Sequence, residues 1–485
     1  MEKYPFKTKP MQHQYDFWLR QRRVKAGAAL MDMGTGKTKL IIDQAAYMYD
    51  NGWINAMIVF GNKGSYENWE EEINLHLPDH IDRQVGVWRS VQNKETKKKL
   101  HELRTCKRMC MKILLINIES LPFKRSFDLA MAFTRYHDTL AVIDESTHIK
   151  NPTAKRTKKA FEIRDAAKAR RIMTGTAVEN RPTDAWAQFE FLRHGCLGHT
   201  SYYSFRAEYA ILKEMTVRQK GQLRTVKTVV GYRNIEKLKN ILAKHSVIIK
   251  KEDCTDLPAK VYLRRYVEMT EEQKRLYEEM RKRSIAEIKE AESYSTVKIA
   301  LTKMLRLHQI VCGYLTDDDG EVHKLPSNRL SAVHDIIQET DEKVIVWANY
   351  RANLDEITAS LQKEYGKETT LGYYGGTTDE DKARVRKELK RGNEGKLKYL
   401  VANPQSGAYG LTLTGANVVV YFSNNFDGEL RSQSEDRCHR IGQTKSVTYI
   451  DLITRDTVDE KILSVLKGKK SLALALTPSN WEIFI

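Results

Sequence analysis

Glycines and a Lys-Thr pair in the stretch MDMGTGKTKLII are spaced for binding phosphate. Gly34 and Gly36 allow a tight backbone turn, so that N–H groups can face phosphate oxygens. Lys37 would then reach the β- and γ-phosphates, and the Thr38 hydroxyl would bind Mg²⁺. The full phosphate-loop pattern has a glycine where this chain has Met31. A glycine turn that merely precedes Lys-Thr is the alternative, but the strand-like stretch before it and the helical pattern after it favour a nucleotide site.

An acidic pair follows an apolar run further along the chain, in LAVIDESTHIKN. Asp144 can hold Mg²⁺ through water, and Glu145 can polarise the water that attacks a γ-phosphate. Taken alone, such a pair is usually the start of a loop or a helix cap. Together with the phosphate loop, it predicts the metal-binding acid and the general base of phosphoryl transfer.

Two arginines lie three residues apart near the C-terminus, in QSEDRCHRIGQ. On a helix, this spacing places the guanidinium groups of Arg437 and Arg440 on one face. A planar, permanently charged guanidinium suits the spread charge of a phosphoryl transition state better than lysine does. An exposed basic helix is the alternative, and it would explain neither the flanking glutamines nor the glycine after Ile441.

Short apolar runs alternate with helical patterns in two regions, which is typical of doubly wound parallel sheets. The expected fold is therefore α/β, with a first lobe at 1–195, a mostly helical insert at 196–329 and a second lobe at 330–485. The insert contains a basic hairpin that we expect to turn at Lys220-Gly221. The expected strands are 26–31, 56–60, 112–116, 140–143 and 170–173 in the first lobe, and 343–348, 398–402, 417–422 and 447–453 in the second.

The charge balance favours a polyanionic partner. The chain has 485 residues, 41% of them hydrophobic, and a net charge of +18, and nucleic acid is the commonest partner of so basic a protein. Lys and Arg outnumber acids eight to two in 94–112 and in 155–171, and eleven to two in 212–251. A charge run is usually a solvated face, so we expect DNA contact from one or two of these three runs.

The remaining composition points to an intracellular protein. The N-terminus MEKYPFKTKPMQHQ has no apolar signal region, and no stretch approaches the roughly 20 apolar residues that a membrane span needs. The six cysteines are scattered without the spacing of a zinc site. We therefore expect reduced thiols, no membrane contact, a monomer, and the cytoplasm of a cell or of a virus's host as the location.

The ordered set of motifs resembles the Snf2 group of superfamily 2 helicase-like ATPases over nearly the whole chain. The phosphate loop, the acidic pair and the arginine segment correspond to motifs I, II and VI of that family. The further segments that carry the resemblance are PMQHQ, MIVFGNKGSYENW, INIESL, MTGTAVEN, LPAKVYLRRYVEMTEEQKRLY, KVIVWANY, YYGGTTDEDKARV and SGAYGLTLTGANVVVYF. The resemblance implies two RecA-like lobes that bind ATP and Mg²⁺ and act on double-stranded DNA.

The same resemblance assigns roles residue by residue. Catalytic roles fall on Glu145, Lys37, Arg440 and Arg437, with Mg²⁺ held by Thr38 and Asp144. ATP binding falls on Gln14, Gly34, Thr35, Gly36, Lys37, Thr38, Asp144, Gly410 and Gln433. Coupling of the ATP site to DNA falls on Thr174, Gly175 and Thr176. DNA contact falls on Lys63, Asn117, Lys150, Asn349, Arg351, Thr377 and Ser406.

Several positions depart from the usual family pattern. Motif II reads DEST followed by His148, Ala177 replaces a proline in motif III, Gly61-Asn62 lacks the proline of motif Ia, and Thr412 stands where many relatives have asparagine. These departures leave the phosphate chemistry intact. They place the chain on a distant branch, near annealing-helicase-like and compact viral or bacterial members, and they argue against nucleosome remodelling.

The function that this resemblance implies is a DNA-stimulated ATPase that translocates along duplex DNA. One alternative is a strand-separating or strand-annealing helicase specific for forks or junctions. Another is a nucleotide-switched DNA-binding module that recruits a nuclease or replication and repair proteins. The acid pair and both arginines favour a working ATPase over the switch.

Overall fold

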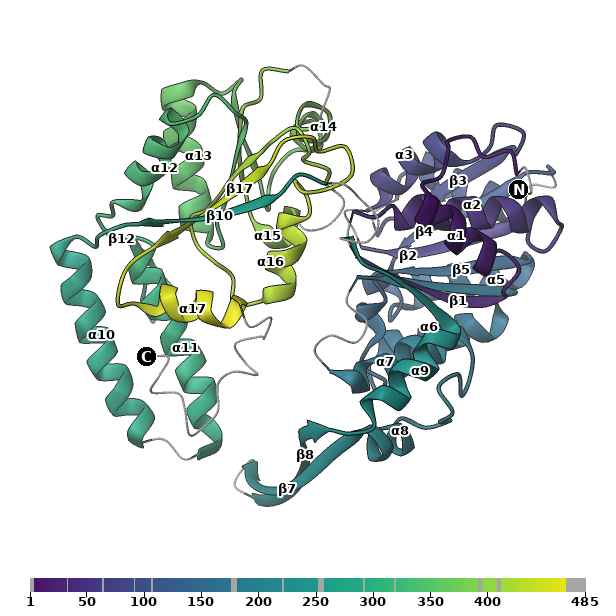
Figure 1. Ribbon diagram of the computed structural model, residues 1–485, viewed down its shortest axis with the longest axis horizontal. Coiled ribbons are helices and arrows are strands. Elements are labelled where there is room, and N and C mark those ends of the chain that lie inside the picture. The colour runs from purple at the N-terminus through teal and green to yellow at the C-terminus, as the bar shows by residue number, and fades with distance from the viewer. Residues whose placement is uncertain are drawn as a thin grey trace. The chain divides into compact units, whose positions relative to one another are not determined.

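A computed structural model shows that the chain forms two compact units (Figure 1). The first unit comprises Met1–Thr216 and Leu223–Asp256, and the second comprises Val217–Gln222 and Leu257–Ile485. The structure describes residues 4–32, 34–62, 65–90, 92–105, 108–175, 181–219, 222–251, 257–290, 293–317, 320–390, 395–407 and 411–467.

The first unit is built on a seven-stranded parallel sheet with the order β3-β4-β2-β5-β6-β1-β9. All five strands expected from the sequence are present. The edge strands β3 and β9 escaped prediction because the first mixes polar residues and glycine among its valines and the second is only four residues long. The strands are β1 (Ala26–Met31), β2 (Ala56–Gly61), β3 (Arg83–Val87), β4 (Met111–Asn117), β5 (Thr139–Asp144), β6 (Ala169–Thr174) and β9 (Ser246–Ile249).

Alternate residues of the central strands enter two separate cores. On β2, Ile58 and Phe60 belong to one core, whereas Met57 and Val59 belong to the other. A parallel sheet needs such cover on both faces, and helices provide it. They are α1 (Gln12–Gln21), α2 (Lys37–Asp50), α3 (Tyr66–His76), α4 (Lys94–Thr105), α5 (Lys124–Tyr136), α6 (Lys155–Ala166), α7 (Ala185–Leu192), α8 (Tyr202–Tyr209) and α9 (Ile235–His245), with 3-10 turns η1 (Ile118–Ser120), η2 (Ser146–Ile149) and η3 (Pro182–Asp184).

The second unit contains a six-stranded parallel sheet with the order β10-β17-β16-β13-β15-β14. All four expected strands are present, and β10 and β14 are the two that the sequence did not reveal. The strands are β10 (Lys260–Tyr266), β13 (Val344–Trp347), β14 (Thr370–Tyr373), β15 (Tyr399–Ala402), β16 (Val418–Tyr421) and β17 (Val447–Ile453). The helices are α10 (Glu271–Glu290), α11 (Ser293–Val311), α12 (Arg329–Gln338), α13 (Arg351–Tyr365), α14 (Asp379–Glu388), α15 (Pro404–Gly407), α16 (Gly428–Glu435) and α17 (Val458–Lys467), and a small ribbon pairs β11 (Tyr314–Thr316) with β12 (Val322–Lys324).

The stretch expected as a separate insert, 196–329, is divided between the two units. Its strand β9 completes the first sheet and its strand β10 is the edge of the second sheet. The expected hairpin is present as β7 (Ala210–Gln219) paired with β8 (Gln222–Tyr232), and its turn at Lys220-Gly221 lies outside the described residues. The physical reason is that β9 and β10 each gain a parallel partner strand, whereas an independent helical insert would leave both unpaired.

Two further expectations concern the cysteines and the membrane. Cys110, Cys196, Cys312 and Cys438 are free thiols, and all four are buried, which the sequence did not predict; Cys106 and Cys254 lie outside the described residues. Within the described part of the chain, no helix combines the length and the apolar character that crossing a membrane requires.

Candidate active site

The phosphate loop connects β1 to α2 in a conformation that requires glycine. Gly34 has a φ of 80° and Gly36 a φ of 83°, both in the left-handed region that other residues avoid. A Cβ atom at Gly36 would also lie 2.1 Å from Nε2 of Gln14. Helix α2 begins directly afterwards at Lys37, so its N-terminal N–H groups point towards the loop.

The Lys37 ammonium lies inside this loop. Its Nζ donates hydrogen bonds to the backbone oxygens of Met31, at 2.7 Å, and Asp32, at 3.2 Å. The hydroxyl of the fully buried Thr35 donates to the same Asp32 oxygen at 2.8 Å, which fixes the loop from within. Thr38 follows in the first turn of α2, half-buried, where its hydroxyl is available to an oxygen-coordinated cation.

Gln14 connects α1 to the phosphate loop. Its buried side chain accepts a hydrogen bond from Met11 N at 3.0 Å and donates to Thr35 O at 3.3 Å. The ring of His13 also contacts Thr35 O, at 3.0 Å from Nε2. The sequence singled out Gln14 but not His13, whose place one residue earlier on the same helix gave no separate signal. The structure therefore brings Gln14, an expected ATP-binding residue, and the phosphate loop together.

The acidic pair ends β5 at the same carboxyl edge of the sheet. The Asp144 carboxylate accepts a hydrogen bond from Trp69 Nε1 at 2.9 Å, which orients it over the end of the strand. Glu145 has a φ of 58°, a left-handed conformation that is rare for a residue with a Cβ atom. Such strain persists only where the surroundings impose it, and it gathers at functional sites.

The Glu145 carboxylate is held by two hydroxyl groups. Thr174 donates to Oε1 from the end of β6, and Thr147 Oγ1 donates to the same oxygen at 3.2 Å. Thr174 also pairs in register with Leu30 of β1, the strand that leads into the phosphate loop. The first of the three coupling residues thus touches the expected base directly, Gly175 follows it, and Thr176 lies outside the described residues.

The arginine segment does not form the expected helix face. Helix α16 ends at Glu435, and Arg437 and Arg440 lie in the turns that follow it. The helical ladder does not continue here, because the Arg437 carbonyl oxygen accepts a hydrogen bond from Leu413 N at 2.9 Å, and Cys438, between the two arginines, is fully buried in the core of the second unit. The prediction that the arginines share one face of a helix is therefore wrong, although both contact the same neighbouring segment.

That neighbouring segment is part of SGAYGLTLTGANVVVYF, which resembles motif V of the family. Arg437 Nη1 donates to Leu411 O at 3.2 Å, and Arg440 Nη1 donates to Thr412 Oγ1 at 3.1 Å. The unusual threonine at position 412 thus serves as an acceptor for the second arginine. The Gln433 amide donates to Glu429 Oε1 at 3.4 Å, one turn earlier on α16, and Gly410 lies outside the described residues.

Arg431 lies on α16, the helix that precedes the arginine segment, and the sequence analysis did not single it out. Its guanidinium contacts Glu435 at 2.8 Å and Asp451 at 2.5 Å, and it stacks 3.4 Å from the centre of the Tyr421 ring. Burial opposes the charge, but Tyr421 and Asp451 outweigh it, so the pKa of Arg431 is raised above its ordinary value. The sequence signal was the acid four residues later, at helical i,i+4 spacing.

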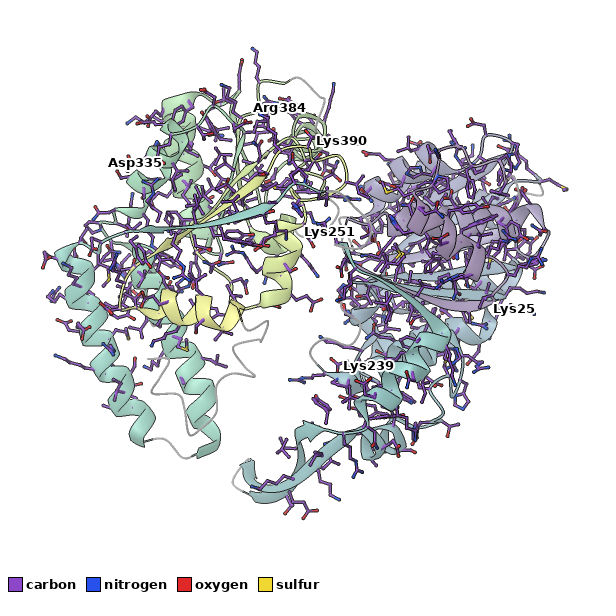
Figure 2. The ribbon with its side chains drawn as sticks, viewed as in Figure 1. Lys25, Lys239, Lys251, Asp335, Arg384 and Lys390 are labelled. Carbon is purple, nitrogen blue, oxygen red and sulfur yellow. The ribbon has the colours of Figure 1, made fainter. Side chains whose placement is uncertain are left out.

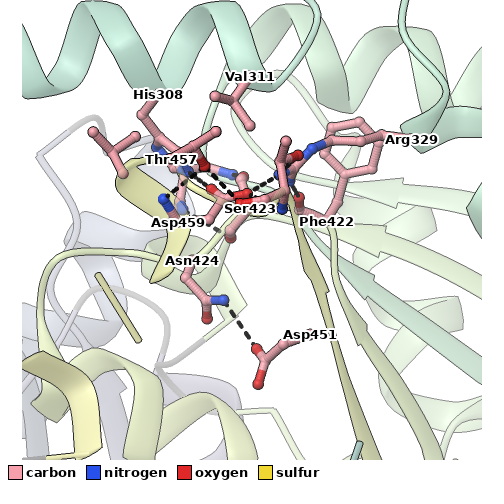
Figure 3. Close-up of polar contacts among 12 residues, drawn as sticks. His308, Val311, Arg329, Phe422, Ser423, Asn424, Asp451, Thr457 and Asp459 are labelled. Carbon is pink, nitrogen blue, oxygen red and sulfur yellow. Dashed lines mark hydrogen bonds and ion pairs between the residues drawn. The ribbon is translucent and has the colours of Figure 1, made fainter. Parts of the chain in front are cut away.

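A second buried ion-pair cluster joins three helices of this unit (Figure 3). Arg329 on α12 pairs with Asp459 on α17, and His308 on α11 lies 3.4 Å from the same carboxylate. Burial disfavours the charged form of His308, but Cys312 and Asp459 together raise its pKa to about 9. Burial likewise opposes the Asp459 carboxylate, yet Arg329 and His308 lower its pKa below the usual value. No motif marked these residues in the sequence.

Two candidate DNA residues lie at the carboxyl edge of the first sheet. Asn117 ends β4, and its side chain accepts a hydrogen bond from Glu119 N at 2.9 Å. Lys150 follows η2 and is exposed. Lys63 lies outside the described residues. Asn117 thus shapes the start of η1, and Lys150 presents its charge on the surface of the same edge.

Four more candidates gather at the carboxyl edge of the second sheet. Asn349, Thr377 and Ser406 follow β13, β14 and β15, which are neighbouring strands, and Arg351 begins α13. The side chains of Asn349 and Thr377 bind backbone oxygens, those of Ser423 at 2.9 Å and Gly372 at 3.0 Å. Arg351 is paired with Asp355 at 2.7 Å, and Ser406 is exposed. In parallel sheets this edge is where ligands bind.

Two family models match the chain. The SNF2-related domain covers residues 12–314, and the helicase conserved C-terminal domain covers residues 328–442. The chain is 26% identical over 455 residues to an uncharacterized ATP-dependent helicase of Mycoplasma genitalium, which covers 92% of this chain and 40% of that protein. It is also 24% identical over 443 residues to the SWI/SNF-related matrix-associated actin-dependent regulator of chromatin subfamily A-like protein 1 of Xenopus tropicalis, covering 90% of this chain and 42% of that protein.

A solved structure is also similar, the SWI2/SNF2 ATPase core of Sulfolobus solfataricus in complex with dsDNA, at 23% identity and a TM-score of 0.43, covering 100% of this chain and 96% of that one. The chain spans less than half the length of the two relatives described above. The first family model alone accounts for more than half of the residues. The chain therefore belongs to the Snf2 family and carries the core of a helicase-like ATPase.

Proposed function

We propose that this protein hydrolyses ATP and uses the cycle to move along double-stranded DNA. The observation that carries the proposal is the contact of Thr174 with Glu145, because it joins the expected base to the strand next to the phosphate loop. Phosphoryl transfer depends mainly on positioning and on charge stabilisation. The fixed Glu145 carboxylate would provide the positioning.

Substrate binding falls to the loop and to Lys37. The left-handed glycines shape a turn whose N–H groups would face phosphate oxygens, and the ammonium would exchange its loop oxygens for phosphate oxygens. Thr38 and Asp144 fit Mg²⁺, because a hydroxyl and a carboxylate are the oxygen donors that this ion prefers. The bound ion would offset phosphate charge. Gln14 would bind the adenine ring of ATP, since its amide is already buried against the phosphate loop.

Glu145 would orient the attacking water and accept its proton. Because its carboxylate is bonded by Thr174 and Thr147, it cannot rotate freely, and the strained backbone keeps it at the strand end. Arg437 and Arg440 would stabilise the charge that develops on the transferred phosphoryl group. Because Arg437 and Arg440 donate hydrogen bonds to Leu411 and Thr412, a shift of the arginines between the ATP-bound and ADP-bound states would also move this segment.

Duplex DNA is the proposed track. The net charge of +18 suits a polyanion, and the candidate contacts in each unit lie at the carboxyl edge of a parallel sheet. Contacts of this kind bind the phosphate backbone irrespective of sequence, so binding should weaken steeply as salt rises. Cycles of ATP binding and release would alter the grip of one unit relative to the other and advance the protein.

The test is steady-state ATP hydrolysis with no DNA, single strands, a blunt duplex and a forked junction. We expect the blunt duplex to stimulate ATP hydrolysis strongly in the wild type and not in Lys37→Ala. The wild type should also displace a triplex-forming strand from duplex DNA when ATP is present. Stimulation restricted to forks would replace the translocase with a fork-specific helicase. ATP binding without stimulation by any nucleic acid would overturn the motor and leave a nucleotide-controlled switch.

A further inference from the structure

The β7–β8 ribbon is a two-stranded sheet that extends from the first unit next to α8 (Figure 1). In the described part of the chain no third strand joins it. A ribbon of two strands is at best marginally stable in water, so it needs contacts with the rest of the protein to stabilise it. Figure 2 shows its side chains extending outwards from the ribbon.

The base of the ribbon is firmly anchored. Arg206 on α8 donates from Nη2 to Lys227 O at 2.6 Å, which ties the helix to the backbone of β8. Arg233, just after β8, donates to Ala207 O at 2.5 Å and to Glu208 O at 3.2 Å. Helix α8 is itself fixed, because Phe205 and Tyr209 are fully buried in the core of the first unit. The ribbon is thus held at a set angle.

The ribbon sequence is rich in basic and polar residues, and its described exposed side chains also include Ile211 and Val230. Residues 210–232 contain five Lys or Arg and a single acid, Glu214. That acid lies 3.5 Å from Lys227 across the ribbon, and both side chains are about two-thirds exposed, at 65% and 63%. Lys213, Thr225 and Thr228 are exposed as well. Threonine and lysine at strand spacing provide hydrogen-bond donors and positive charge along an extended edge.

We propose that the β7–β8 ribbon is a second contact with double-stranded DNA, separate from the carboxyl edges of the two sheets. The inference rests on the proposed function, since it assumes that the protein works on duplex DNA. A two-stranded ribbon fits a DNA groove, and its basic side chains can reach the phosphates on either side. Charge complementarity is the argument for DNA as the occupant, because five Lys or Arg against one acid in residues 210–232 attract the uniformly charged phosphate backbone of a duplex.

The experiment compares two double variants in duplex binding. Lys213→Ala/Lys227→Ala removes two described ribbon charges. Lys363→Ala/Lys367→Ala removes two exposed charges at the C-terminal end of α13, which is the end opposite the carboxyl edge of the second sheet. Binding of a labelled blunt duplex is followed by fluorescence anisotropy at several salt concentrations, with ATP hydrolysis in the absence of DNA as the control for folding.

We expect the slope of log affinity against log salt to become about two units less steep in the ribbon variant, because each phosphate contact contributes roughly one. The α13 variant should keep the wild-type slope, and Lys213→Arg/Lys227→Arg should keep it too. Equal slopes in the ribbon variant and the wild type would overturn the inference and point to a protein strand as the ribbon's partner.

The design separates this inference from the proposed function. If the wild type shows no duplex-stimulated ATP hydrolysis, the proposed function fails and the ribbon inference fails with it. If the wild type is stimulated but the ribbon variant binds duplex with an unchanged slope, only the ribbon inference fails. Equal loss of slope in both double variants would show a general charge effect and would also overturn it.

Discussion

The two units position their reactive groups by different means. In the first unit, backbone conformation does most of the positioning: left-handed glycines shape the phosphate loop, and Glu145 occupies a left-handed conformation at a strand end. In the second unit, the arginines lie in turns and bond to Leu411 and Thr412, and the same unit contains buried ion pairs, Arg431 with Asp451 and Arg329 with Asp459. We therefore expect the first unit to be most sensitive to substitutions that change backbone conformation, and the second unit to substitutions that remove a buried charge.

The largest expected effect is in the second unit, at Arg440. Arg440→Ala should lower kcat for duplex-stimulated ATP hydrolysis by about 10³-fold or more, with little change in ATP affinity. Arg440→Lys should not restore the rate, because lysine lacks the planar, multiple donors of guanidinium. Exposed Arg455, in the same unit, gives the matched control, since Arg455→Ala should hydrolyse ATP normally. Rates within threefold of wild type in Arg440→Ala would remove this arginine from the chemistry.

Glu145 is the corresponding test in the first unit. Glu145→Gln keeps the shape and the acceptor for Thr174 but removes the basic carboxylate, so kcat should fall about 10²- to 10⁴-fold. Binding of a fluorescent ATP analogue should persist. Thr174→Val tests positioning alone, and it should reduce kcat by a smaller factor while leaving the analogue's affinity unchanged. A Glu145→Gln enzyme with normal turnover would assign the base elsewhere.

Removing a buried charge should destabilise only the second unit. Asp459→Asn leaves Arg329 and His308 without their shared carboxylate, and breaking a buried pair typically costs about 3–5 kcal/mol. Hydrogen exchange should therefore speed up in α12 and α17 and stay unchanged in β1 and β5. Asp456→Asn, three residues earlier and exposed, is the control. Faster exchange throughout both units would contradict their separate construction.

The same cluster predicts a pH dependence. The folded pKa of His308, about 9, lies above its ordinary value, so protonation stabilises the fold. This contribution is complete below a pH of about 6.5 and is lost as pH rises through about 9. Protection of α11 and α17 from exchange, corrected for intrinsic rates, should thus decrease between these pH values. In Asp459→Asn the decrease should shrink, and an unchanged pH profile would separate His308 from the carboxylate.

The smallest expected effect compares two glycines of the first unit. Gly36→Ala places a Cβ in a left-handed conformation and 2.1 Å from Gln14, so ATP binding should weaken and unfolding should become easier by about 1–3 kcal/mol. Gly52 has a φ of 68° but nothing within 4 Å of its Cβ position. Gly52→Ala should therefore show a smaller loss of stability, measured by thermal unfolding, and unaltered ATP binding. Equal losses of stability and of ATP binding in the two variants would mean that the Gln14 side chain moves away from the added Cβ at little cost.

The sequence was most informative where chemistry and buried strands coincide. Continuous apolar runs revealed the central strands, and the phosphate loop and acidic pair lie where the pattern placed them, at strand ends. Edge strands were missed because β10 exposes most of its residues and β3 is only partly buried. An edge strand has one neighbour, so its composition is less constrained than that of a central strand.

The arginine segment shows why local spacing fell short. Three-residue spacing is compatible with a helix, but the Arg437 carbonyl oxygen bonds to Leu413 N, which is distant in sequence, and local spacing does not reveal such a tertiary contact. The Arg329–Asp459–His308 cluster was invisible for a related reason. Its members come from three helices far apart in sequence, and a lone arginine, acid or histidine carries no signal until the fold brings them together.

The strand order of the second sheet also bears on how the protein is made. Strand β17, at 447–453, lies between β10 and β16, so the edge strand near residue 260 has no partner in this sheet until residues 447–453 have been synthesised. The first sheet, in contrast, is complete once β9 at 246–249 has been synthesised. The first unit can therefore fold during translation, whereas the second must wait for its last strand, and β10 needs protection from aggregation in the interval.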